Sequence, residues 1–206
     1  LINLTVLKLD NNGIEGTIPN EIESLATIQV VDLGNNNLNG TVPTTLKNLT
    51  NLTVLALNDN NFDGAIPKEI GEIKNLEVLN LAGNSIVGVI PEEIAELGNL
   101  QTINLAGNMI TGELPTEIGE MENLEIINIA NNAINGTIPG QIGNLTKLKE
   151  LNLGNNTFGG TIPPEFGNLE NIQTLDLGSN RLNGTIPDGV KNLTNLEDIN
   201  IDGNDI

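Results

Sequence analysis

Several residue types that carry much of protein chemistry are missing from this chain of 206 residues. It contains no cysteine, histidine, tryptophan or tyrosine, and only three phenylalanines. The absence of cysteine excludes disulfides and thiolate chemistry, and the absence of histidine removes the commonest general base and metal ligand. No apolar run approaches the length that spans a membrane. Because the serines have no histidine partner, we expect no enzymatic activity, no cofactor and no bound metal.

Basic residues are scarce as well. The chain has 27 Asp and Glu against 8 Lys and Arg, a net charge of -19. This charge favours solubility and repels the phosphates of nucleic acids and the anionic surfaces of membranes. We therefore expect no nucleic-acid partner and no insertion of this segment into a membrane.

What the sequence does contain is one pattern repeated every 24 residues. Eight full copies and a ninth that reaches Ile206 follow one another without insertion or deletion. The apolar residues that open the copies are Leu1, Leu25, Leu49, Ile73, Leu97, Met121, Leu145, Leu169 and Leu193. A fixed period of this size indicates a solenoid, in which each copy packs against its neighbours. We therefore predict one elongated domain over residues 1–206.

Each copy predicts the same local structure, described here for the first copy. Leu7 and Leu9 have the two-residue period of a strand with one buried face. The asparagine at Asn12 recurs in all nine copies, and its buried carboxamide can bond the backbone of its own turn and of the next one. Gly16 suits a bend, and Pro19 fixes the following turn and opens a short helical segment. Each copy is therefore predicted to be a strand, a turn, a second extended stretch and a helical turn.

This pattern, LxxLxxLxLxxNxLxGxIPxxLGx, resembles the plant-specific form of the leucine-rich repeat. The segment from Leu49 to Glu72, LTNLTVLALNDNNFDGAIPKEIGE, is similar to repeats of plant receptor-like kinase ectodomains, receptor-like proteins and polygalacturonase-inhibiting proteins. The resemblance implies a right-handed, curved α/β solenoid with a parallel sheet on its concave face, a short second sheet, and short helical turns on its convex side. It also implies an extracellular or cell-surface recognition or scaffold domain that binds a protein, peptide or glycan.

Two features depart from the usual ectodomains of that family. The repeats contain no irregular insertions, and no cysteine-paired capping segments are present. Solenoid ends need polar caps, and open strand edges pair with other chains. We therefore expect either flanking domains beyond residues 1 and 206 or end-to-end association. The alternative function is a structural or assembly segment of a larger surface protein.

The resemblance places ligand specificity on exposed positions of the concave strands. Two rows cross the central copies: Val78, Thr102, Ile126 and Glu150 in the first, and Asn80, Asn104, Asn128 and Asn152, assigned to the strand centres, in the second. The rows predict a shallow groove for an extended ligand. A purely structural interpretation also holds, because Val and Ile favour strands and the rows lack the Trp, Tyr and Arg that are typical of binding hot spots.

Threonine recurs at a further exposed position, two residues before the proline of each copy. The row comprises Thr17, Thr41, Thr137, Thr161 and Thr185, while Ala65, Val89 and Glu113 interrupt it in copies three to five. A regular threonine ladder on a flat sheet can order water, so ice binding is a third and lower-ranked function. The simpler interpretation is that threonine suits an exposed strand.

Nine Asn-x-Ser/Thr sequons are candidates for N-glycosylation. They begin at Asn3, Asn39, Asn48, Asn51, Asn135, Asn144, Asn155, Asn183 and Asn192. Because the repeat itself generates the sequences NGT and NLT, the sequons alone do not establish secretion. The expected extracellular location rests on the resemblance.

Overall fold

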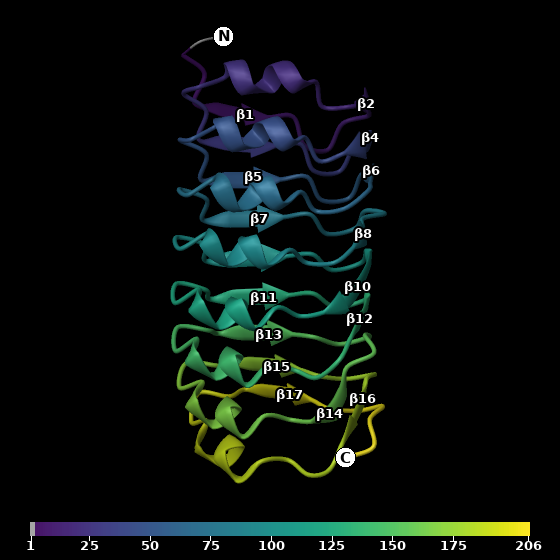
Figure 1. The fold of residues 1–206 in the computed structure, drawn as a ribbon, viewed down its shortest axis with the longest axis vertical. Helices are drawn as coiled ribbons and strands as arrows, with labels where there is room; N and C mark the ends of the chain where they lie inside the picture. Colours follow the sequence, from purple (N-terminus) through teal and green to yellow (C-terminus); the bar gives the residue numbers. More distant parts are fainter. Residues whose placement is uncertain (1–2) are drawn as a thin grey trace.

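Each repeat begins with a three-residue strand whose middle side chain points into the core. In the computed structural model, which describes residues 3–206, nine such strands pair in parallel and in chain order (Figure 1). They are β1 (Val6–Lys8), β3 (Val30–Asp32), β5 (Val54–Ala56), β7 (Val78–Asn80), β9 (Thr102–Asn104), β11 (Ile126–Asn128), β13 (Glu150–Asn152), β15 (Thr174–Asp176) and β17 (Asp198–Asn200). Equivalent residues of successive repeats are partners in this sheet. Leu1, which opens the first predicted copy, lies outside the described residues.

A second set of strands follows the asparagine turn and forms the lateral side of the stack. These strands are β2 (Glu15–Gly16), β4 (Asn37–Thr41), β6 (Asn61–Asp63), β8 (Val87–Gly88), β10 (Met109–Glu113), β12 (Ala133–Asn135), β14 (Gly159–Thr161) and β16 (Arg181–Asn183). They pair in groups of three, three and two. Unlike the first sheet, this one pairs residues 22 positions apart, as in Val87 with Met109. On the lateral side, successive strands are therefore shifted by two residues relative to the repeat period.

A 3₁₀ helix completes each repeat on the side opposite the first sheet. The helices are η1 (Asn20–Ser24), η2 (Thr44–Asn48), η3 (Lys68–Glu72), η4 (Glu92–Glu96), η5 (Thr116–Glu120), η6 (Gly140–Asn144), η7 (Pro164–Asn168) and η8 (Asp188–Asn192). A proline precedes each one with extended backbone, as the sequence predicts. Five residues are too few for a helix that is stable alone, so these turns depend on stacking against their neighbours.

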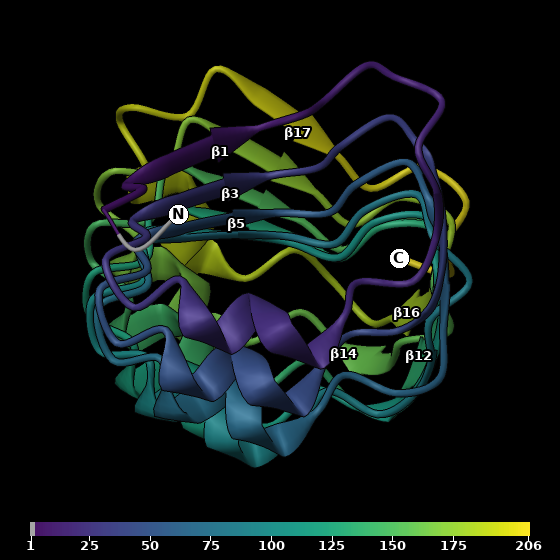
Figure 2. The same ribbon diagram turned by 90° about the horizontal axis from the view of Figure 1, so that it is seen from above.

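The stack is curved and twisted. Viewed along its length, the central strands lie nearer the helical side than β1, β3 and β17 do (Figure 2). The first sheet is therefore the concave face and the 3₁₀ helices form the convex one. In the same view β1 and β17 slope in opposite directions, which shows that the repeats wind into a superhelix. These features confirm the predicted solenoid.

The helices are not evenly spaced, and their spacing follows the fourth residue of each one. The pair η6–η7, whose first member has glycine at Gly143, is in closer contact than the pairs that begin with Glu23, Lys47 or Ala95. A Cβ added to Gly143 would lie 2.7 Å from the Cβ of Glu165 in the next helix. Glycine at this position therefore lets successive helices approach each other.

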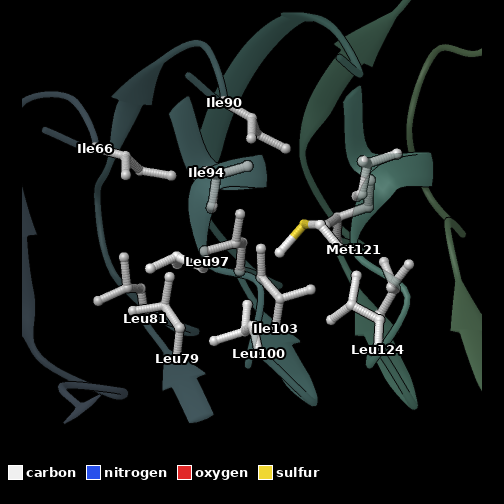
Figure 3. Close-up of a cluster of buried hydrophobic side chains, with 14 of the residues drawn as sticks. Ile66, Leu79, Leu81, Ile90, Ile94, Leu97, Leu100, Ile103, Met121 and Leu124 are labelled. Carbon is white, nitrogen blue, oxygen red and sulfur yellow. The ribbon is translucent and has the colours of Figure 1, made fainter. Parts of the chain in front are cut away.

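One apolar core runs the length of the stack. In Figure 3, Leu79 and Leu81 lie beside Leu97, Leu100 and Ile103 of the next repeat, and these side chains are fully buried. Each fully buried Leu or Ile contributes about 1.5–3 kcal/mol relative to exposure. Because each inner layer is covered by the layers on both sides, the buried side chains form one continuous cluster.

The recurring asparagine connects adjacent repeats, as the sequence predicts. The Nδ2 of Asn108 donates to Leu105 O in its own turn and to Leu81 O, both at 3.0 Å, and its Oδ1 accepts from Ile86 N at 3.0 Å. The expectation that it bonds the following turn was wrong, because Leu81 and Ile86 belong to the preceding repeat. The Leu81 carbonyl faces the repeat that follows it, so the asparagine of that following repeat is the donor within reach.

Surface ion pairs contribute little to this stack. Lys74 Nζ lies 2.6 Å from Glu96 Oε2, and both side chains are more than half exposed. We expect Lys74→Ala to lower the free energy of unfolding by less than about 1 kcal/mol, because solvent and salt screen such pairs. Urea denaturation measures the loss, and 0.5 M NaCl should make it smaller still. A loss above about 2 kcal/mol would show that the pair is structural.

Candidate functional site

The parallel register of the concave sheet brings the eight predicted residues into two rows. Val78, Thr102, Ile126 and Glu150 are successive partners, and so are Asn80, Asn104, Asn128 and Asn152. All eight side chains are half-buried and lie on the open side of β7, β9, β11 and β13. The strands are spaced about 4.8 Å apart, so each row spans roughly 14 Å across four repeats.

The second row does not lie at the strand centres, and that part of the prediction was wrong. Each strand ends at the asparagine itself, as β9 does at Asn104. A local hydrogen bond accompanies this strand end: Asn104 Oδ1 accepts the N–H of Ala106 at 3.2 Å. That N–H is thereby withdrawn from the ladder of the sheet, and the chain turns.

The same bond holds the Oδ1 atoms of the other asparagines in the row. Asn128 Oδ1 accepts from Ala130 N at 3.2 Å, and Asn152 Oδ1 accepts from Gly154 N at 3.1 Å. Within residues 3–206, the Nδ2 atoms of Asn104, Asn128 and Asn152 have no intramolecular acceptor. Asn80 differs, because its Nδ2 donates to Asn58 Oδ1 at 3.1 Å. Three repeats therefore present a row of oriented donors.

A smooth strip lies beside these donors. The residues two positions after the four asparagines are small, Ala82, Ala106, Ala130 and Gly154, and Gly178 continues the strip two positions after Asp176. Larger side chains bound the strip: Asn58 lies on its amino-terminal side and Asp202 on its carboxy-terminal side. We call this strip, with the row of donors along one edge, the trough. Five surface hollows in the described residues lie instead on the lateral and convex sides, and none of these five includes the eight predicted residues.

All nine sequon asparagines are exposed, so none is excluded as a glycan attachment site by burial. Two of them already use the amide nitrogen. Asn51 Nδ2 donates to Ala26 O at 2.8 Å, and Asn48 Nδ2 donates to Glu23 Oε2 at 2.6 Å. The Asn51 bond belongs to a row that the sequence reasoning missed, in which Asn75 and Asn99 bond the preceding repeat in the same way.

The threonine row is exposed but is not an in-register ladder. Because the second sheet pairs residues 22 positions apart, Thr137 is opposite Gly159, and Thr161 is opposite Asn183. Threonines of neighbouring repeats are offset along the strands. The regular lattice of hydroxyls that motivated the ice-binding hypothesis is therefore staggered, besides being interrupted in copies three to five.

Acidic side chains lie on the convex side, among them Glu92, Glu93 and Glu96 of η4 and Glu117 and Glu120 of η5. Within residues 3–206, no group of three or more metal-ligating residues has a geometry suited to holding a metal ion. None of the helices described there has the length and apolar character needed to cross a membrane.

The lateral side carries exposed residues that the sequence reasoning did not identify as a site. Val87 and Met109 lie on two neighbouring strands, β8 and β10, and Val89 directly follows β8; each is at least 41% exposed. The only signal in the sequence was the interruption of the threonine row at Val89. The other two occupy different positions of the repeat and give no shared pattern.

Comparisons with known proteins agree with the fold. Family models described as leucine-rich repeats match residues 2–62, 52–110, 123–145, 147–169 and 161–206. A search of curated proteins gives no match.

Solved structures include receptor ectodomains from plants. The ectodomain of the Arabidopsis thaliana receptor kinase GASSHO1/SCHENGEN3, in complex with CASPARIAN STRIP INTEGRITY FACTOR 2, is 35% identical with a TM-score of 0.97, over 98% of this chain and 24% of its own. The Arabidopsis receptor kinase HAESA, with the peptide hormone IDA and co-receptor SERK1, is 36% identical with a TM-score of 0.89, over 97% of this chain and 33% of its own.

A plant ice-binding protein is more distant. It is 23% identical with a TM-score of 0.69, over 97% of this chain and 74% of its own, and this similarity shows a shared fold alone. The chain spans about a quarter to a third of the length of the receptor chains that it matches.

Proposed function

This chain belongs to the leucine-rich repeat family, and from that membership we propose that it is a non-catalytic recognition domain whose concave face binds an extended peptide outside the cell. One matched receptor ectodomain, HAESA, is in complex with the peptide hormone IDA, which supports a peptide over a glycan. The observation that carries the proposal is the row of fixed amide donors on Asn104, Asn128 and Asn152.

The spacing of these donors suits a peptide backbone. Asn104 and Asn152 lie two strand spacings apart, about 10 Å, and an extended chain covers that distance in about three residues. In the polyproline II form of an extended peptide, with three residues per turn and a rise of about 3.1 Å, carbonyls three residues apart point to the same side about 9 Å apart and can accept from both ends of the row. Because the Oδ1 atoms are already held by the backbone, little conformational entropy is lost when a ligand binds.

The charge of the trough favours a basic residue on the ligand. Glu150 is a partner of Thr174, which is in turn a partner of Asp198. Asp176 and Asn200 follow on the adjacent row. An extended peptide with Lys or Arg over the carboxy-terminal repeats would be attracted to these carboxylates, and an acidic one would be repelled.

We predict that Asn128→Asp weakens peptide binding by about tenfold or more. Aspartate keeps the oxygen that accepts the Ala130 N–H, but it replaces the outward donor with a second acceptor. Peptides selected from a displayed random library against the wild-type domain provide the probe, and fluorescence anisotropy measures their affinity. Asn61→Asp on the exposed strand β6 makes the same charge change away from the trough and should leave affinity within about twofold. Selected peptides that bind both variants equally well would rule out the concave site.

An assembly role is the second candidate. Apolar side chains are exposed at both ends of the described stack, including Val6 and Leu9 in the first repeat and Ile199 in the last. Sedimentation velocity separates the two functions, because stacking gives a mass that grows with concentration whereas a recognition domain stays monomeric at micromolar concentration. The staggered threonines give the ice-binding alternative no comparable support.

A further inference from the structure

The lateral patch, defined as Val87, Val89 and Met109, is an exposed apolar surface that the stack does not require. These side chains are 41%, 53% and 51% exposed. The other large hydrophobic side chains that are exposed in residues 3–206 are Val6, Leu9, Ile186, Ile199 and Ile206. Those five lie in the first repeat or the last two, where fewer neighbours cover them. The lateral patch lies in the fourth and fifth repeats, which are covered on both sides.

Sheet register makes the patch continuous. Ala65 is a partner of Val87, and Val87 is a partner of Met109, so three apolar residues cross three repeats in one line. Val89, just after β8, adds to this line and lies close to the backbone of the next strand, where a Cβ added to Gly112 would be 2.7 Å from Val89 Cγ1. Four apolar residues are therefore near neighbours on this side.

Carboxylates border one side of the patch. Val89 and Pro115 share a hollow of about 480 Å³ with four glutamates, Glu92, Glu93, Glu113 and Glu117. In the part of the chain that the structure describes, none of these four carboxylates forms an ion pair. An apolar strip beside unpaired negative charge is complementary to a surface that combines aliphatic and basic side chains.

The same region is free of sequons. Between Asn51 and Asn135 the sequence contains no Asn-x-Ser/Thr triplet, although both flanking regions contain several. On the lateral side, the sequons at Asn39, Asn135 and Asn183 lie in the strands on either side of this interval. Residues 52–134, which include the patch, therefore offer no sequon for an N-linked glycan.

We propose that the lateral patch is a docking surface for a segment of another protein in which aliphatic residues alternate with lysine or arginine. Aliphatic side chains would cover Val87 and Met109 while basic ones reach Glu113 and Glu117. A second copy of this chain is a poorer occupant, because each copy carries a net charge of -19 and the same glutamates would face one another. This surface is separate from the concave trough, so the proposed docking at the lateral patch and the proposed peptide binding in the trough can be tested independently.

A matched set of short fluorescent peptides tests the occupant. The first alternates leucine with lysine, the second leucine with glutamate, and the third serine with lysine. In 150 mM NaCl, fluorescence anisotropy should show the leucine–lysine peptide binding the wild-type domain about tenfold or more tightly than either of the others. If the serine–lysine peptide binds as tightly as the leucine–lysine peptide, the binding is non-specific attraction between charges. That result would overturn the proposal.

Variants then locate the binding. The double variant Val87→Thr, Met109→Thr should weaken the leucine–lysine peptide about tenfold, because threonine keeps the strand propensity and removes apolar surface. Val6→Thr is the control that makes the same kind of change on β1. Glu113→Gln removes one of the carboxylates that border the patch, and Glu197→Gln is its control. Both controls, and the trough variant Asn128→Asp, should leave affinity within about twofold. Loss of binding with Val6→Thr, or a concentration-dependent dimer of the wild type that the double variant abolishes, would refute the proposed occupant.

Discussion

Replacing Asn156 with leucine is expected to lower the free energy of unfolding by about 3–5 kcal/mol. Its Nδ2 donates to Ile129 O at 3.0 Å, Leu153 O at 3.1 Å and Gly154 O at 3.3 Å, and its Oδ1 accepts from Ile134 N at 3.0 Å. All four bonds are buried. Each buried backbone group left without a partner costs about 1–3 kcal/mol, and the apolar leucine satisfies none of them.

Urea denaturation measures this loss, and Asn61→Leu provides the matched control. Asn61 is exposed on β6, so the same substitution there should change stability by about 0.5 kcal/mol or less. Because a solenoid is stabilised by contacts between neighbouring repeats, amide hydrogen exchange in the Asn156 variant should rise first over residues 121–168. Equal losses for the two variants, or exchange that rises uniformly along the chain, would contradict the role assigned to Asn156.

The second large effect is expected for Gly143→Ala, which should cost about 1–3 kcal/mol. The added Cβ would lie 2.7 Å from the Cβ of Glu165 and nearer still to the Glu165 backbone oxygen. Because those atoms belong to the adjacent helix and not to a flexible side-chain end, η6 and η7 must separate. Overpacking of this kind typically costs 1–3 kcal/mol.

Gly98→Ala is the control for this substitution. No atom lies within 4 Å of a Cβ built on Gly98, and its φ is not in the left-handed region. Alanine there should be neutral or stabilise slightly, because it restricts the unfolded chain. Thermal unfolding of the two variants side by side would show whether close approach, and not the loss of glycine as such, sets the cost. If both variants unfold like the wild type, the helices are not in tight contact.

The repeat architecture could be predicted because each recurring residue has a local physical role. The period located the strands, Asn108 was recognisable as a buried backbone partner, and the proline before each 3₁₀ helix marked its start. The preceding-repeat partners of Asn108 could not be predicted, because they depend on which way the Leu81 carbonyl points. A sequence period carries no information on that direction.

The candidate sites were predictable only in part, for the same reason. The two concave rows followed from the 24-residue period, since their partners are equivalent residues. Whether an amide nitrogen is free, as in Asn128, or bonded, as in Asn80 to Asn58, depends on side-chain contacts. The lateral patch could not be predicted from the 24-residue period. The 22-residue register of the lateral strands aligns Ala65, Val87 and Met109, which occupy three different positions of the repeat.

The uneven spacing of the 3₁₀ helices has a consequence for the shape of the trough. Strands on the concave side keep a nearly constant separation of about 4.8 Å, whereas the convex side is closer where the fourth helical residue is glycine, as at Gly119 and Gly143, than where it is Lys47 or Ala95. A side chain at that position separates successive helices on the convex side and increases the curvature of the stack. Glycine there lets the helices approach and reduces the curvature. The width of the trough is therefore tuned from the opposite side of the molecule, by positions that no ligand touches.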